Sequence, residues 1–234
     1  MNGLTNRFSR AGLAHVLPFA VFMAALGLAS FLNWLGGEDG AWWLKEAKYW
    51  VYPIQTLLCG GLIVLFWREY DWGCIKQVRW GISWGAVVFF LWVSPQMVFG
   101  APPRLEGFNP YAVGGGEGIA FWISLLLRML RLTVVVPIIE EIFWRSFLMR
   151  WFIAEKDWQK VKFGTPNLGA FSAVVILFAF VHSFLDIFGA IAAGVIYGYL
   201  ALKTRSLAAC VTAHAVTNLL LGVYILWTQQ WGFW

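Results

Sequence analysis

Long apolar segments alternate with short polar stretches along the whole chain. Such segments cover residues 11–35, 50–67, 80–99, 119–153, 168–185, 187–203 and 206–228. A helix needs about 20 apolar residues to cross a ~30 Å hydrocarbon core, and each segment is close to that length except the longer fourth one. The pattern therefore predicts an all-α fold, a polytopic transmembrane bundle of seven or eight helices.

The fourth segment decides between seven helices and eight. It contains Pro137, and proline removes a backbone donor and clashes with the preceding turn of a helix. We therefore expect residues 119–153 to kink or to split into two helices. A single crossing gives seven helices, whereas a separate crossing by residues 119–135 gives eight.

Lysine and arginine residues predict the orientation, because cytoplasmic loops carry an excess of them. With a cytoplasmic N-terminus and one crossing by residues 119–153, the outer side holds only Lys45, Lys48 and Arg104. The inner side then holds eleven, namely Arg7, Arg10, Arg68, Lys76, Arg79, Arg150, Lys156, Lys160, Lys162, Lys203 and Arg205. We favour this assignment, although Arg128 and Arg131 within the fourth segment leave eight helices open.

Composition agrees with a membrane protein. Of the 234 residues, 60% are hydrophobic and only 12% are charged, against about 25% charged in soluble domains. The net charge of +5 is spread over short loops, so it indicates topology and not a nucleic-acid partner. We expect a single membrane domain over residues 1–234, with accessory spans in 1–118 and a core that carries the chemistry in 119–228.

Two adjacent carboxylates and a guanidinium interrupt the apolar fourth segment: Glu140, Glu141 and Arg145. One ionised side chain near a bilayer centre costs about 2.5–3.5 kcal/mol, and such residues are functional hypotheses by default. Glu141 and Arg145 share a helix face at a spacing of four residues, whereas Glu140 lies about 100° away. We infer that Arg145 pairs with Glu141 and that Glu140 is free for chemistry. A purely structural ion pair that locks two helices is the alternative.

Histidines occur in two later segments, at His182 and at His214, and Asn218 follows His214 at a spacing of four residues. At 1.5 Å per residue, Glu140, His182 and His214 lie roughly 15, 21 and 13 Å along their segments. Each depth is about halfway across the hydrocarbon core. A lone histidine in an apolar helix is more often a packing residue, but this shared depth predicts that the three helices converge on a polar mid-membrane cavity.

A carboxylate, two imidazoles and a carboxamide around a wet cavity suit hydrolysis. Glu140, with His182, could deprotonate a water molecule, and His214 and Asn218 could donate hydrogen bonds to the oxyanion that forms. Alternatively, Glu140, His182 and His214 could ligate Zn²⁺ and leave a fourth position open. The residues alone leave both mechanisms open.

Three motifs together resemble the CPBP family: Glu140-Glu141-x-x-x-Arg145, Phe178-x-x-x-His182 and His214-x-x-x-Asn218. That family comprises CAAX prenyl endopeptidases of the Ras-converting type and bacteriocin-processing or self-immunity (Abi) proteins, and we also consider its bacterial CAAX-protease-related branch. The resemblance covers about residues 119–228. It implies an all-helical intramembrane fold with a conical cavity open to the cytosol. It also implies that Glu140 activates water, that His182 assists, and that His214 and Asn218 form the oxyanion site.

The leading hypothesis is therefore an intramembrane endopeptidase in a bacterial inner membrane, with Glu141 and Arg145 fixing the position of Glu140. Its partners would be the lipid bilayer and a peptide or membrane-protein substrate that enters from the cytoplasm. The alternative is a non-catalytic immunity or partner-binding protein that uses the same cavity. A transporter or proton relay is third, because the chain shows no paired repeats with interrupted helices.

Overall fold

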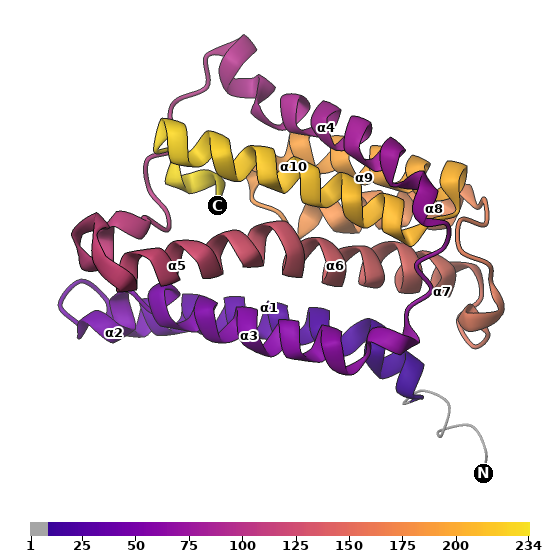
Figure 1. The fold of residues 1–234 in the computed structure, drawn as a ribbon, viewed down its shortest axis with the longest axis horizontal. Helices are drawn as coiled ribbons and strands as arrows, with labels where there is room; N and C mark the ends of the chain where they lie inside the picture. Colours follow the sequence, from indigo (N-terminus) through magenta and orange to yellow (C-terminus); the bar gives the residue numbers. More distant parts are fainter. Residues whose placement is uncertain (1–8) are drawn as a thin grey trace.

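The structure, a computed structural model, describes residues 9–234, and Arg7 lies outside them. The described residues form helices and no strand. The α-helices are α1 (Arg10–Gly36), α2 (Trp42–Lys45), α3 (Lys48–Leu65), α4 (Val78–Phe99), α5 (Gly118–Leu130), α6 (Val136–Glu141), α7 (Met149–Ile153), α8 (Leu168–Phe180), α9 (Ile187–Thr204) and α10 (Leu207–Thr228). Figure 1 shows them as an elongated bundle.

The predicted segments correspond to the observed helices, which confirms the transmembrane bundle. Five helical stretches are long and apolar enough to cross a membrane: Arg10–Gly36, Ile75–Phe99, Gly118–Ile153, Phe184–Thr204 and Leu207–Thr228. Helix α3 has 18 residues, and the apolar helix α8 has only 13. The protein is therefore an integral, multi-pass membrane protein.

Pro137 does not split the fourth segment. Helices α5, α6 and α7 are joined by the π-helical stretches Arg131–Val135 and Ile142–Leu148, so that Gly118–Ile153 is one helical run of 36 residues. A proline ring clashes with the carbonyl four residues before it in an α-helix. The wide π turn lies directly before Pro137 and accommodates this clash, and the bundle keeps one crossing here.

The long run α5–α6–α7 lies between two groups of helices in Figure 1. Helices α1 and α3 lie against each other on one side of it, and α4 and α10 lie on the other. Two glycines bring α4 and α10 into backbone contact. A Cβ at Gly81 would lie 2.5 Å from the Ala209 oxygen, and one at Gly85 would lie 2.9 Å from the Val216 Cβ.

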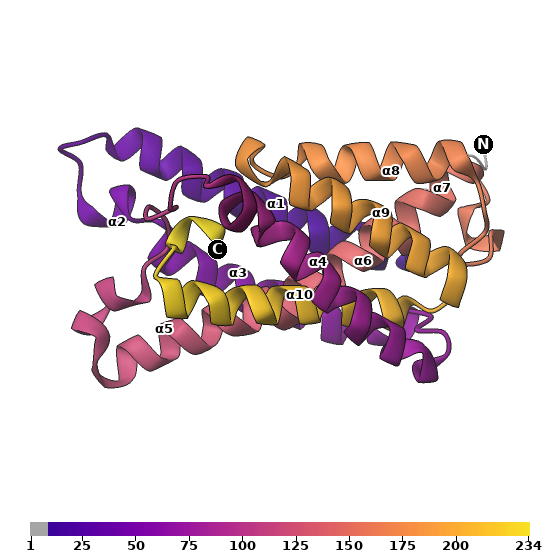
Figure 2. The same ribbon diagram turned by 90° about the horizontal axis from the view of Figure 1, so that it is seen from above.

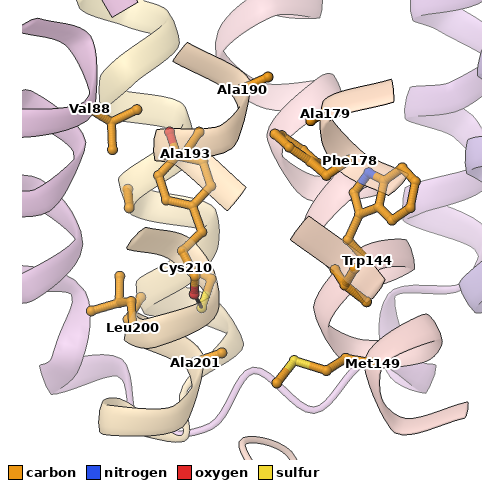
Figure 3. Close-up of a cluster of buried hydrophobic side chains, with 14 of the residues drawn as sticks. Val88, Trp144, Met149, Phe178, Ala179, Ala190, Ala193, Leu200, Ala201 and Cys210 are labelled. Atoms are coloured by element: carbon orange, nitrogen blue, oxygen red, sulfur yellow. Dashed lines mark hydrogen bonds between the residues drawn. The ribbon is translucent and has the colours of Figure 1, made fainter. Parts of the chain in front are cut away.

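Small residues also join α9 to α8, as the spacing of Ala190, Gly194 and Gly198 predicts. A Cβ at Gly198 would lie 2.6 Å from the Phe171 ring, and one at Gly194 would lie 3.4 Å from Val175. Beside this contact is a buried apolar cluster in which Figure 3 shows Trp144 and Phe178 across from Ala193 and Cys210. This cluster places buried apolar side chains around the polar groups of α6 and α10.

Helix α8 ends earlier than the sequence predicts. It stops at Phe180, and the expected helical segment 168–185 is therefore wrong at its end. Thirteen residues rise only about 20 Å, which is less than the hydrocarbon core. Figure 2 shows α2 and the start of α5 at one end of the bundle, and the turn from α8 to α9 does not reach that end.

Candidate active site

One buried carboxylate links two of the three motifs. Glu141 Oε1 accepts a hydrogen bond from Arg145 Nη1 at 2.9 Å and lies 2.9 Å from His214 Nδ1. Glu141 is fully buried, Arg145 is 1% exposed and His214 is 6% exposed. The helix α6 and the π-helical stretch after it supply the ion pair, and α10 supplies the imidazole. The ion pair expected from the spacing is therefore present, and it also holds His214.

Two aromatic rings enclose this ion pair. The Arg145 guanidinium lies 4.7 Å from the centre of the Phe178 ring and 5.4 Å from that of Tyr197. The Tyr197 ring also stacks on His214, with centroids 5.3 Å apart, and its hydroxyl donates to Thr217 Oγ1 at 2.7 Å. The sequence does not single out Tyr197, because Ala190, Gly194 and Gly198 in the same segment are typical of close helix packing. A hydroxyl-bearing side chain within that apolar segment was the signal available.

Glu140 differs from its neighbour. It is 7% exposed, and its Oε2 atom is buried without a hydrogen-bond partner among the described residues. A buried ionised oxygen without a partner is unfavourable. Among the described residues Glu140 forms no ion pair with Arg145, in contrast to Glu141. The spacing in the sequence predicts that Glu141 pairs with Arg145 and that Glu140 does not. The ion pairs among the described residues agree with this prediction.

His182 lies in the turn after α8 and not within a helix. Its Nδ1 atom lies 2.7 Å from the Phe178 oxygen, a distance at which Nδ1–H donates to the carbonyl and Nε2 keeps its lone pair. The ring lies 4.6 Å from the Phe178 ring, which in turn lies 6.4 Å from His214. Phe178 thus brings the second motif beside the first and the third.

An ionic cluster fixes the turn that carries His182. Asp186 accepts hydrogen bonds from Arg104 Nη1 at 2.5 Å, from Ser183 Oγ at 2.5 Å and from Trp92 Nε1 at 3.1 Å. Arg104 also donates to the Leu185 oxygen. The Trp92 ring packs on His182, with centroids 5.6 Å apart. From the sequence, Arg104 is predicted only to be one of the few cationic residues of the outer side, because a contact across 82 residues has no local signature.

Asn218 has a different partner from His214. Its Nδ2 atom donates to the Leu132 oxygen at 2.9 Å, within the π-helical stretch Arg131–Val135. A π turn displaces carbonyls from the regular α-helical ladder, and the carboxamide binds one of them. His214 and Asn218 are therefore one turn apart on α10, but His214 contacts Glu141 and Asn218 contacts the Leu132 oxygen.

The zinc alternative does not fit this arrangement. Among the described residues, no group of three or more His, Cys, Asp and Glu side chains is placed to hold a metal ion. Glu140, His182 and His214 thus do not form a ligand set in this conformation.

The region that carries the three motifs matches a known protein family. Residues 122–220 match the family described as "Type II CAAX prenyl endopeptidase Rce1-like". The matched region contains all three motifs, and it confirms the resemblance inferred from them. No curated protein and no solved structure shows significant similarity to the chain.

Proposed function

Because residues 122–220 carry an Rce1-like domain, we propose that this protein is an intramembrane endopeptidase that hydrolyses a peptide bond in a peptide or membrane protein. The observation that carries the proposal is the contrast between two adjacent carboxylates. Glu141 contacts both Arg145 and His214 through its Oε1 atom, while Glu140 is nearly buried and has neither an ion pair nor a hydrogen bond among the described residues; the Oε2 atom of each carboxylate is buried without a partner. A paired carboxylate positions other groups, whereas an unpaired one can accept a proton.

Glu140 is the general base in this proposal. Its carboxylate takes a proton from a water molecule as that water attacks the scissile carbonyl, and it returns the proton to the leaving amine. General bases of this kind typically contribute about 10²–10⁴-fold to a rate. His182 assists by orienting the water, because its Nδ1–H is directed at the Phe178 carbonyl and Nε2 is left to accept a hydrogen bond.

His214 stabilises the oxyanion. Its Nδ1 faces Glu141, so Nε2 can donate only when the ring is protonated. Asn218 contributes its remaining N–H group, since one is used by the Leu132 carbonyl. A single oxyanion donor is typically worth about 2.7–4 kcal/mol.

Glu141 and Arg145 are positioning residues. They hold the imidazole of His214 and the helix that carries Glu140, and Phe178 and Tyr197 shield the pair from water. No step passes through a metal ion in this scheme. We further propose a bacterial inner-membrane location with the lysine- and arginine-rich end of the bundle in the cytoplasm, following the charge bias.

The test is proteolysis by the full chain in liposomes, with libraries of peptides and of membrane proteins as substrates. We expect Glu140→Gln to lower the cleavage rate by about 10²–10⁴-fold, and His214→Gln to lower it by about 10²–10³-fold, while both variants still fold. Glu117→Gln is the matched control, because this exposed carboxylate lies at the start of α5. Full cleavage by Glu140→Gln would overturn the proposed base. A cellular phenotype that survives Glu140→Gln would favour the non-catalytic binding protein.

A further inference from the structure

Tyr197 of α9 is a buried aromatic residue whose ring faces two residues of the candidate active site. The residue is 1% exposed. Its ring lies nearly parallel to the His214 imidazole, with the two planes 27° apart and the centroids 5.3 Å apart. The Arg145 guanidinium lies 5.4 Å from the centre of the same ring. Tyr197 therefore packs on the residue that we assign to the oxyanion, although it belongs to none of the three motifs.

The contact with Glu141 does not by itself fix the orientation of the His214 ring. Nδ1 lies 2.9 Å from Glu141 Oε1, and this contact fixes the position of one ring atom. The ring can still turn about the line that joins these two atoms, because the χ2 torsion of histidine has broad minima. Such a turn moves Nε2, the atom that faces the oxyanion in the proposed mechanism. A second contact, on the face of the ring, is therefore needed to fix the imidazole plane.

Tyr197 supplies this contact on the ring face. The Phe178 ring also lies near His214, but its centroid is 6.4 Å away and its plane is inclined by 77°. That contact is edge-on, whereas the Tyr197 ring is stacked on one face of the imidazole. Offset stacking is one of the arrangements that aromatic pairs prefer. Tyr197 is therefore the residue best placed to hold the imidazole plane.

Two further helices hold the Tyr197 ring in place. Its hydroxyl donates to Thr217 Oγ1 of α10 at 2.7 Å, and Thr217 Oγ1 lies 2.8 Å from the Gly85 oxygen of α4. Thr217 follows His214 by three residues, so the two side chains are neighbours on one face of α10. A Cβ at Gly85 would lie 2.4 Å from the Ala213 oxygen, so glycine is what allows α4 this close. The ring is thus fixed at one end by α9 and at its hydroxyl by α10 and α4.

We propose that Tyr197 is a positioning residue, whose ring fixes the plane of the His214 imidazole so that Nε2 is directed at the oxyanion. The effect on the reaction rests on the proposed function, whereas the effect on the orientation of His214 does not. The ring is the part that faces His214, and the hydroxyl only anchors the ring. Phenylalanine should therefore replace Tyr197 in this role, and leucine should not.

The first test compares cleavage by full-chain variants in liposomes. Tyr197→Leu should lower kcat by roughly 10–100-fold and leave KM within about twofold, because a displacement of about 1 Å can cost about 10²-fold in rate. Tyr197→Phe should stay within severalfold of the wild type. Tyr199→Leu is the matched control, since Tyr199 lies on the same helix but is 48% exposed, and its kcat should equal that of the wild type. Equal kcat values for Tyr197→Leu and Tyr199→Leu would overturn the proposal.

A double variant separates positioning from a general loss of packing. If Tyr197 acts through His214, Tyr197→Leu should lower the rate by no more than about twofold when it is added to His214→Gln, because residues that act through one another are not additive. A loss of the same factor in both backgrounds would show that Tyr197→Leu damages the fold as a whole. That result would also overturn the proposal.

A spectroscopic readout does not depend on cleavage. The full chain is prepared in detergent with isotope-labelled histidine rings, and the His214 signals are assigned by their loss in His214→Gln. We expect one sharp set of signals in the wild type and in Tyr197→Phe. In Tyr197→Leu we expect a second set or marked broadening, because the imidazole then turns about its contact with Glu141. A single sharp set in Tyr197→Leu would overturn the inference.

The two readouts also distinguish a failure of this inference from a failure of the proposed function. If Glu140→Gln cleaves as fast as the wild type while the His214 signals of Tyr197→Leu split or broaden, the proposed function fails and the positioning of His214 by Tyr197 stands. If Glu140→Gln is impaired while Tyr197→Leu keeps the rate and the signals of the wild type, the proposed function stands and this inference fails.

Discussion

The variants Glu140→Gln and Glu141→Gln should change the stability of the protein in opposite directions. Glu141→Gln removes the charge between Arg145 and His214, both nearly fully buried. Breaking a buried pair by neutralising one partner typically costs about 3–5 kcal/mol. At about 2–4 °C per kcal/mol for a chain of this size, the unfolding midpoint should fall by roughly 6–20 °C. Glu140→Gln removes an unpaired buried charge, so stability should stay the same or rise.

Activity should change in both variants but for different reasons. Glu140→Gln should lower kcat by about 10²–10⁴-fold in a protein with an intact midpoint. Glu141→Gln should lose activity along with stability. The assay is a thermal melt in detergent together with peptide cleavage below the lower midpoint. The reasoning is refuted if Glu140→Gln destabilises the protein as much as Glu141→Gln does, because Glu140 would then have a partner that its surroundings do not show.

Four further outcomes are expected. Tyr197→Phe should lower the free energy of unfolding by about 0.5–1.5 kcal/mol in a denaturation series while activity stays within severalfold, because the ring on His214 remains. Gly85→Ala should cost about 1–3 kcal/mol by pushing α4 from α10, whereas Gly61→Ala, with nothing within 4 Å, should be neutral or stabilising in the same series. Asp186→Asn should speed hydrogen exchange around His182 and lower kcat, because three donors lose a charged acceptor. A chelator should leave cleavage rates unchanged, since the candidate ligands do not converge.

The apolar pattern predicted the bundle well because hydrophobic length alone decides where a helix can cross a bilayer. The Glu141–Arg145 pair was likewise predictable from a local spacing of four residues. The end of α8 could not be predicted from the sequence, because Val181, Phe184 and Leu185 are as apolar as the helix before them. The continuity through Pro137 depends on a wide π turn, which has no clear sequence signal.

Contacts between distant segments were the least predictable part of the site. Tyr197 reaches His214 from another helix, and Arg104 reaches Asp186 from a loop. Nothing in the residue types alone indicates either partner. The contacts of His214 with Glu141 and of Asn218 with the Leu132 oxygen depend in the same way on how α10 is rotated against the long helical run that carries both partners.

The shortness of α8 has a consequence for the surrounding lipid. A helix of about 20 Å next to the longer, 18-residue α9 creates a hydrophobic mismatch on one side of the protein, and Phe180 and Phe184 are 77% and 88% exposed there. Lipids next to a short apolar stretch thin the bilayer or reorganise around it. The turn with His182 would then lie closer to bulk water than its position in the sequence implies. Turnover in liposomes should therefore depend on acyl-chain length and decrease in thick bilayers.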